Sequence, residues 1–153
     1  MNNIKIRPAT PGDLAIILKF EQGIIEAERP FDPTLREEKF HYYDLSARMA
    51  DPDAAVMVAE DNGRVIAGGS VVIKKGNSYN IFTDYAFLGF MFVEPEYRGQ
   101  GVNSLIIEGL IGWSHKRGLK EIRLQVYSDN HPAIRAYEKV GFKKILTEMR
   151  LDV

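Results

Sequence analysis

The pattern of apolar and polar positions divides the first third of the chain into a strand and two helices. Residues 4–7 alternate apolar and polar side chains, as a half-buried strand does. Apolar residues then recur at helical spacing until Arg29-Pro-Phe-Asp-Pro interrupts them, and the stripe comprises Leu14, Ile16, Ile17, Phe20, Ile24 and Ile25. The segment Thr34-Leu-Arg-Glu37 matches a capping box, which predicts a second helix running to about Met49.

Strand signals dominate the middle of the chain. Residues 54–59 and 65–73 are β-rich runs on either side of Asp61-Asn-Gly63, a combination that predicts an antiparallel hairpin. Residues 85–93 are almost entirely apolar, which is typical of a strand buried on both faces.

The last third alternates helices and strands. Residues 102–117 predict a helix ended by Gly118, residues 122–127 a strand, and residues 130–140 a helix ended by Gly141. Residues 142–151 predict a closing strand. The order β-α-α-β-β-β-α-β-α-β, without repeats or linkers, predicts one α/β (α+β) domain over residues 1–153 with a mixed sheet.

Composition narrows the function classes. The 153 residues carry a formal net charge of −1, which argues against nucleic acid or an anionic membrane as the partner. The chain has no cysteine, and His41, His115 and His131 show no metal-ligand spacing, so we expect no metal. No apolar run could span a bilayer and no signal peptide is present, which favours a cytoplasmic enzyme or binding module.

Candidate chemistry begins at the turn Arg98-Gly-Gln-Gly101, which joins the buried strand to a helix. The first amides of a helix have no intrahelical partner, and two glycines let the backbone approach a ligand. The turn therefore suits a phosphate, although a surface turn would use the same residues. The nucleotide fingerprints fail, because no Gly-Lys-Ser/Thr follows and Ser104 stands where a third glycine is needed.

A second constellation lies downstream, in Asn130-His-Pro-Ala-Ile-Arg-Ala-Tyr-Glu-Lys-Val-Gly-Phe142. Asn130 sits at a strand-to-helix junction, and Ala133 and Tyr137 share one helix face. Taken alone, Asn130 reads equally as a helix cap and Tyr137 as a core aromatic.

Together, the two segments resemble the GNAT superfamily of N-acetyltransferases. The specific motifs occupy residues 91–107 and 124–142, and the resemblance covers the whole order of elements. It implies a GNAT-like fold with a mixed, mostly antiparallel sheet. It also implies acetyl-CoA (coenzyme A) as co-substrate and direct transfer of the acetyl group to an amine.

The resemblance assigns cofactor-binding residues along both segments. Backbone amides of the turn would cradle the pyrophosphate, and these residues are Arg98, Gly99, Gln100, Gly101, Val102, Asn103 and Ser104. Asn103 departs from the family pattern, in which Gly or Ala is usual. The bulged strand at Met91, Phe92 and Val93 would pair with the pantetheine arm and supply an oxyanion donor.

The same resemblance assigns the remaining roles. Asn130 would bind a pantetheine amide, with Ala133 on the same helix. Tyr137 would be the catalytic residue that protonates the leaving thiolate.

The acceptor side is less defined. Some family members carry a glutamate as general base at the position of Phe87, so this chain has no general base at that position. Glu26, Glu28 and Tyr85 are the substrate-binding candidates, and the segment Glu26 to Asp32 with three carboxylates favours a cationic small-molecule or peptide amine. A polyamine, an amino acid, an aminoglycoside and a protein N-terminus all stay open.

Other interpretations remain open. The chain could be a non-catalytic acyl-CoA-binding or sensor module that uses the same cleft. It could also be a different nucleotide-binding α/β protein. The acyl group could be larger than acetyl, although Phe90 and Phe92 favour a small one. A homodimer through sheet edges or helix faces is compatible with the sequence.

Overall fold

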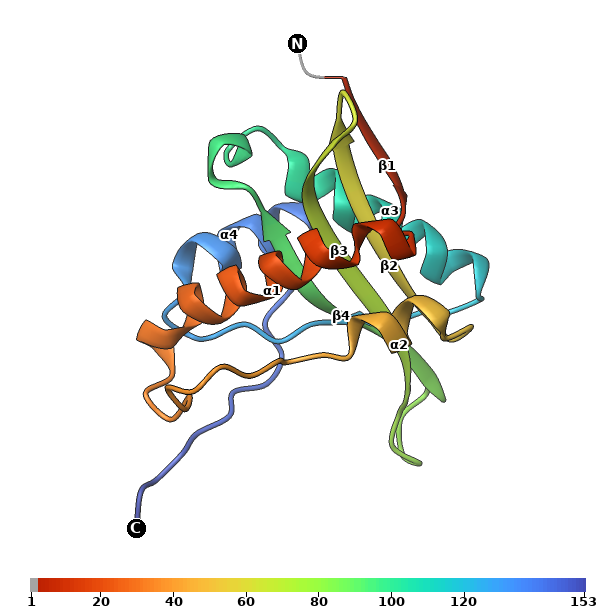
Figure 1. Cartoon of the computed structure of the whole chain (residues 1–153). Helices are drawn as coiled ribbons and strands as arrows, with labels where there is room; N and C mark the ends of the chain where they lie inside the picture. The colour runs from red at the N-terminus through yellow and green to blue at the C-terminus, as the bar shows by residue number, and fades with distance from the viewer. Residues whose placement is uncertain (1–2) are drawn as a thin grey trace.

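The computed structural model describes residues 3–153 and shows a five-stranded sheet with helices on both faces (Figure 1). The strand order is β1-β2-β3-β4-β5, antiparallel from β1 to β4 and parallel between β4 and β5. The strands are β1 (Ile4–Pro8), β2 (Ala54–Asp61), β3 (Arg64–Lys75), β4 (Asp84–Val93) and β5 (Ile122–Arg123). The helices are α1 (Leu14–Glu28), α2 (Leu45–Ala50), α3 (Val102–Lys116) and α4 (His131–Val140), with short 3-10 turns at Pro11–Asp13, Arg29–Phe31 and Pro95–Tyr97.

Two apolar clusters fix the helices to the sheet. On one face, Ile17 and Phe20 of α1 and Leu45 of α2 pack with Val56, Val58 and Phe90. On the other face, Ile106, Ile107 and Leu110 of α3 pack with buried residues of β2, β3 and β4. The apolar stripes therefore bury the sheet between two helical layers, as the hydrophobic effect requires.

A β-bulge interrupts β4. Gly68 pairs with Phe92 and Ser70 with Gly89, so Phe90 and Met91 together lie opposite the single residue Gly69. Phe90 adopts a positive φ of 49°, which is rare for a residue with a side chain.

The bulge reverses which face each side chain of β4 meets. Before it, Ala86 and Leu88 face the α3 layer, whereas after it Phe90 and Phe92 face the α1 layer. An extra residue inverts the two-residue period, which is why β4 contributes apolar side chains to both layers.

Strand β4 separates from β5 shortly before the bulge. Their pairing is confined to Ala86 with Ile122 and Phe87 with Arg123. The strand predicted over residues 122–127 is correspondingly short, because only its first two residues have a partner on β4. The backbone of the second half of β4 is therefore open on the β5 side.

The predicted helix over residues 34–49 is wrong in its first part, since α2 begins only at Leu45. Asp44 caps it by accepting a hydrogen bond from the backbone N–H of Ala47 at 3.0 Å. Thr34 does not cap a helix because its hydroxyl donates to the Asp32 carboxylate at 2.5 Å. The side chains of Gln22 and Arg29 bind the carbonyls of Phe40 and Arg36, which keeps this segment non-helical.

The predicted closing strand over residues 142–151 is also not formed. The segment is extended and exposed, and no backbone hydrogen bond joins residues 143–153 to the rest of the described chain. A strand needs a neighbour, and this segment has none among residues 3–153.

Other expectations are confirmed. Asn62 and Gly63 both have positive φ, as a tight hairpin turn requires, and Gly118 and Gly141 follow α3 and α4 in left-handed conformations. None of the helices between residues 3 and 153 has the length and apolar character needed to cross a membrane.

Substituting Gly69→Ala tests the packing opposite the bulge. A Cβ there would lie 2.6 Å from Ile106 Cγ2 and 2.8 Å from Met91 Sδ, so we expect a loss of about 1–3 kcal/mol in the free energy of unfolding. The matched control is Gly112→Ala in α3, where a Cβ meets nothing within 4 Å and should stabilise the helix by up to about 1 kcal/mol. Urea unfolding measures both, and equal stabilities for the two variants would contradict this packing.

Candidate functional site

The glycine turn places free helix amides at one end of the open strand. Gly99 and Gly101 have φ of 76° and 81°, and nothing lies within 4 Å of a Cβ built on either. Gly101 is the N-cap of α3 and has no side chain to cap the first amides of the helix. The turn therefore presents unshielded N–H groups and the positive end of a helix dipole, which suit an anion.

Arg98 and Gln100 brace this turn. Arg98 Nε donates to the carbonyl of Val93 at 2.9 Å, and its guanidinium lies 5.5 Å from the ring centroid of Phe92. Gln100 Nε2 donates to the carbonyl of Glu96 at 2.9 Å. These contacts fix the turn relative to the end of β4.

At the bulge itself, Tyr43 reaches the strand from the loop before α2. Its hydroxyl oxygen accepts a hydrogen bond from the backbone N–H of Phe90 at 3.0 Å. The Phe92 ring stacks on Phe20 of α1 at 4.7 Å between centroids. Phe92 thus contributes its backbone, rather than its side chain, to the open edge.

A buried polar group supports the Tyr43 contact. Arg48 lies 4.4 Å from the Tyr43 ring centroid and donates to Ser70 Oγ at 2.8 Å, while Ser70 donates to the Gly89 carbonyl at 3.1 Å. Burial lowers the pKa of Arg48. Gly89 and Phe90, at the start of the bulge, are therefore held by the side chains of Ser70 and Tyr43.

Glu21 anchors the same loop from inside α1. Its carboxylate is fully buried and accepts from the Tyr43 backbone N–H at 2.9 Å. The other oxygen lies 2.6 Å from His41 Nδ1, on a side chain that is 49% exposed. A buried carboxylate needs such partners, so Glu21 fixes where residues 41–43 cross α1.

Glu28, at the end of α1, lies among tyrosines. Its charge raises the pKa of Tyr42, Tyr127 and Tyr137, although in each of these residues burial is the larger cause. Burial, opposed by Tyr42 and reinforced by Asp32, raises the pKa of Glu28 itself. The Tyr42 hydroxyl is buried and interacts with the Glu28 carboxylate. Glu28 is thus a half-buried carboxylate within an aromatic surrounding.

Asp32 has a structural role. Its carboxylate accepts from Thr34, from the Tyr127 hydroxyl at 2.9 Å and from both terminal nitrogens of Arg150 at 3.0 and 3.2 Å. These hydrogen bonds hold the pKa of Asp32 well below its usual range. Of the three carboxylates in this segment, Asp32 is neutralised by Arg150, and exposed Glu26 pairs with Arg29 at 2.9 Å.

Tyr137 and Asn130 come from α4. Burial, with the charges of Glu28 and Tyr43, raises the pKa of Tyr137 to about 12, so its phenol keeps its proton at neutral pH. Asn130 Oδ1 accepts from the Ala133 N–H at 3.4 Å, which makes it the helix cap. Its side-chain NH₂ is the group that could still donate to a ligand.

Two sequence candidates lie toward the start of β4. Tyr85 lies under the guanidinium of Arg123, 3.9 Å from its ring centroid, and Phe87 contacts Lys74 Nζ at the same distance. Some family members have a glutamate at this position, where this chain has Phe87 with the ammonium group of Lys74 over its ring.

Sequence reasoning missed Tyr43, Glu21 and His41 as site residues. No local motif marks Tyr43, because its hydroxyl accepts a hydrogen bond from a strand 47 residues away. The signal that could have found Glu21 is its place on the apolar face of α1, between Ile17 and Ile25.

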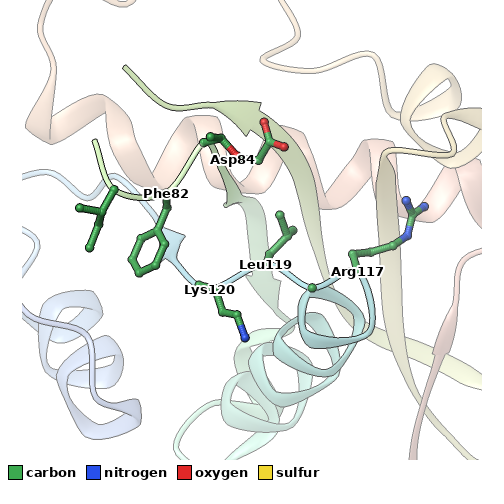
Figure 2. Close-up of a pocket in the computed structure, with 8 residues that line it drawn as sticks. Phe82, Asp84, Arg117, Leu119 and Lys120 are labelled. Carbon is green, nitrogen blue, oxygen red and sulfur yellow. The ribbon is translucent and has the colours of Figure 1, made fainter. Parts of the chain in front are cut away.

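A separate hollow of about 240 Å³ lies at the opposite end of α3 (Figure 2). It is bounded by residues 81–83 of the β3–β4 loop, by Asp84 at the start of β4 and by Arg117–Lys120. Figure 2 shows Phe82 and Asp84 on one side and Leu119 and Lys120 on the other. It is not continuous with the glycine turn, which lies at the first residue of α3.

Comparisons with known proteins agree with this geometry. The model of the Acetyltransferase (GNAT) family matches residues 21–142. Thialysine N-epsilon-acetyltransferase of Sus scrofa is 27% identical over 154 residues, covering 95% of this chain and 87% of that protein. The ribosomal protein bS18-alanine N-acetyltransferase of Escherichia coli (strain K12) is 36% identical over 64 residues, 42% of this chain and 43% of that enzyme.

A solved structure has the same fold. It is described as a predicted acetyltransferase with acetyl-CoA from Clostridium acetobutylicum, and it aligns with a TM-score of 0.73. The two chains are 18% identical, and the alignment covers 97% of this chain and 96% of that one.

Replacing Tyr43→Phe removes the acceptor for the Phe90 N–H at the bulge. An unpaired buried N–H costs about 1–3 kcal/mol, and we expect the free energy of unfolding to fall by that amount. Tyr79→Phe is the control, because Tyr79 is 81% exposed and its change should be neutral. A Tyr43→Phe variant as stable as the control would show that the Phe90 contact contributes nothing.

Proposed function

The chain belongs to the acetyltransferase (GNAT) family, and on that premise we propose that it transfers an acetyl group from acetyl-CoA to a primary amine. The observation that carries the proposal is open backbone at two places. These are the half of β4 that β5 leaves unpaired and the uncapped amides at Gly101. A cofactor with an amide-rich arm and a pyrophosphate matches the two places in turn.

The glycine turn would hold the pyrophosphate. Left-handed backbone, as at Gly99 and Gly101, is typical of turns whose amides bind an anion, and the space beside both residues is open. Asn103 and Ser104 lie in the first turn of α3, where their backbone amides extend the same cradle. Arg98 adds a permanent positive charge nearby.

The second half of β4 would hold the arm and the reacting carbonyl. The side chains of Met91 and Val93 pack into the α3 layer, so their backbone lies beside the strand, where Arg98 already binds the Val93 carbonyl and the N–H of Val93 would be left for a ligand. Since Tyr43 already accepts the Phe90 N–H, an amide beyond the bulge is the candidate oxyanion donor. Asn130 NH₂ and Ala133, on α4, would contact the arm from the other side.

Glu28 and Tyr137 would carry out the proton transfers. A raised pKa makes the Glu28 carboxylate a better base for an incoming ammonium group, and its aromatic surrounding favours a cation. Tyr137 keeps its proton at neutral pH and would stabilise the leaving thiolate by hydrogen bonding. Acetyl-CoA supplies an activated acetyl group, so the chain has to position both partners and exclude water.

The acceptor is a small-molecule or peptide amine. Its recognition would centre on Glu28, with Tyr42 and Tyr127 beside it. Burial and a hydrogen bond to Glu28 raise the pKa of Tyr42, so its phenol would stay protonated beside the carboxylate that binds the amine.

Calorimetry with acetyl-CoA tests the cofactor site. Gly101→Trp fills the open space beside the turn, and we expect at least a hundredfold loss of affinity. Gly118→Trp is the matched control, since Gly118 also has a left-handed φ and open surroundings but lies at the other end of α3. Equal affinities in both variants, or no binding by the wild type, would contradict the proposal.

Turnover tests the proton carriers, measured as thiol release with a polyamine, an amino acid, an aminoglycoside and a short peptide. We expect the wild-type rate to rise with pH through the raised pKa of Glu28, because only the ionised carboxylate is a base. Glu28→Gln should lower the rate by about 10²-fold and remove this acidic limb, whereas Glu26→Gln should not. Tyr137→Phe should lower turnover while acetyl-CoA still binds.

A stability measurement separates these effects from misfolding. A carboxyl with a raised folded-state pKa contributes stability below its unfolded pKa that is lost as pH rises through the folded value. Glu28→Gln should therefore not destabilise the fold at pH 7. Unchanged turnover in both Glu28→Gln and Tyr137→Phe would contradict these proton roles, whereas a wild type that binds acetyl-CoA without turning over any acceptor would favour a non-catalytic acyl-CoA-binding module.

A further inference from the structure

Arg48 of α2 is a half-buried cation that takes no part in the proposed proton transfers. Its Nη1 donates to Ser70 Oγ at 2.8 Å, which is its only hydrogen bond among residues 3–153. None of the ion pairs in that part of the chain includes Arg48. Because a guanidinium has several N–H donors in a rigid fork, most of the donors of Arg48 are left without a protein acceptor.

The buried carboxylate of Glu21 does not serve as the counter-ion of Arg48. One of its oxygens accepts from the Tyr43 N–H at 2.9 Å, and the other lies 2.6 Å from His41 Nδ1. Burial lowers the pKa of Arg48, an effect that Tyr43 and Glu21 oppose. A partly desolvated cation is costly without a counter-ion, so this arrangement favours an anion supplied by a ligand.

The Tyr43 hydroxyl is a second donor beside the guanidinium. Its oxygen accepts from the Phe90 N–H at 3.0 Å, but its own O–H donates to no group in the described chain, residues 3–153. Burial is the main cause that raises the pKa of Tyr43, so the phenol keeps its proton at neutral pH. A Cβ built on Gly89 would lie 3.3 Å from the Tyr43 hydroxyl oxygen and 3.6 Å from Arg48 Nη1. Two donors, one of them charged, therefore meet over the backbone of Gly89.

A ligand can reach this position from solvent. Gly89, Tyr43 and Arg48 are each partly exposed. Phe87 lies two residues before Gly89 and so points to the same face of the sheet, where it belongs to neither apolar cluster. Figure 1 shows the β3–β4 hairpin continuing past α2. Lys74 Nζ, 3.9 Å from the Phe87 ring centroid, places a second cation on this open part of the sheet.

We propose that the acceptor of the acetyl group carries a carboxylate and that Arg48 and Tyr43 bind this carboxylate over Gly89. The inference rests on the proposed acetyl transfer and names the class of acceptor, an amine of the amino-acid type. A carboxylate fits because its two oxygens match a guanidinium fork and a hydroxyl donor, and because its charge is opposite to that of Arg48.

The carboxylate site adjoins the groups assigned to proton transfer. The rings of Tyr43 and Tyr42 lie 5.8 Å apart between centroids, and the Tyr42 hydroxyl interacts with Glu28. Besides burial, both Glu28 and Tyr43 raise the pKa of Tyr137, so these groups are neighbours. The acceptor would thus place its ammonium group at Glu28 and its carboxylate at Arg48. Opposite charges at the two positions select an amine with a carboxylate over a diamine.

Rates with matched acceptors test the carboxylate site. Thiol release is measured with lysine against lysinamide, and with alanyl-glutamyl-alaninamide against alanyl-glutaminyl-alaninamide, so that an amide replaces one carboxylate in each pair. We expect the wild-type kcat/KM to be about 10–100-fold higher for the carboxylate member of a pair. A preference in the first pair identifies a free amino acid as the source of the carboxylate, and one in the second pair an acidic peptide.

Substitution of Arg48 assigns this preference to the guanidinium. Arg48→Gln should bring the kcat/KM ratio within each pair close to one, and Arg48→Lys should retain part of the preference. The matched control is Arg36→Gln, because Arg36 also lies over an aromatic ring, 5.5 Å from the Phe40 centroid, but is exposed. It should keep the full preference. Circular dichroism verifies that each variant is folded.

The outcomes separate this inference from the proposed function. Turnover by the wild type without a preference for the carboxylate, or a preference that survives in Arg48→Gln, overturns the carboxylate site alone. The wild-type comparison decides the question even where Arg48→Gln does not fold. Failure to bind acetyl-CoA, or binding without turnover of any acceptor, instead overturns the proposed acetyl transfer and this inference with it.

Discussion

At Phe90 and Met91, β4 has two residues opposite the single Gly69 of β3, and this mismatch shapes both layers of the molecule. It turns Phe90 and Phe92 toward α1 while Met91 and Val93 face α3. Together with the separation from β5 after Phe87, it leaves backbone groups in the middle of the protein without strand partners. Such groups are costly unless a ligand or water binds them, so the same defect that weakens the sheet creates a binding edge.

The bulge is maintained by contacts from distant parts of the chain. A positive φ at Phe90 is unfavourable, and the structure offsets it with the Tyr43 hydroxyl and with Ser70 at the preceding carbonyl. Tyr43 is in turn positioned by the buried carboxylate of Glu21. Because Tyr43 belongs to the loop that borders Glu28, the acceptor side and the cofactor side are connected through one hydroxyl group.

Local sequence patterns were sufficient wherever a short segment determines its own conformation. The Asn62-Gly63 hairpin, the glycines that end α3 and α4, and the turn at Gly99 and Gly101 follow from backbone preferences of a few residues. Patterns failed where a distant group decides the outcome. Thr34 has the sequence of a helix cap, but Asp32, held by Arg150 more than a hundred residues away, takes its hydroxyl.

Residues 142–151 and Tyr43 show in two ways what sequence patterns could not predict. The alternation in residues 142–151 predicts a strand that does not form, because a strand needs a neighbour and residues 3–153 provide none for it. Tyr43 has no distinguishing pattern at all, because its role depends on where the bulge brings the Phe90 amide. Motifs predicted the glycine turn and proposed a role for Tyr137, whereas the residues that hold the bulge are visible only in the structure.

The central claim is that the open backbone of β4 and the uncapped start of α3 form one binding surface for acetyl-CoA. Two-dimensional amide NMR spectra recorded during a titration with acetyl-CoA test it most directly. The account predicts that the largest shifts occur at the amides of Met91, Val93, Gly99 and Gly101 and at those that open α3. Shifts confined to the hollow at Ile81–Asp84 and Arg117–Lys120, or no shifts in β4 and the glycine turn, would contradict it.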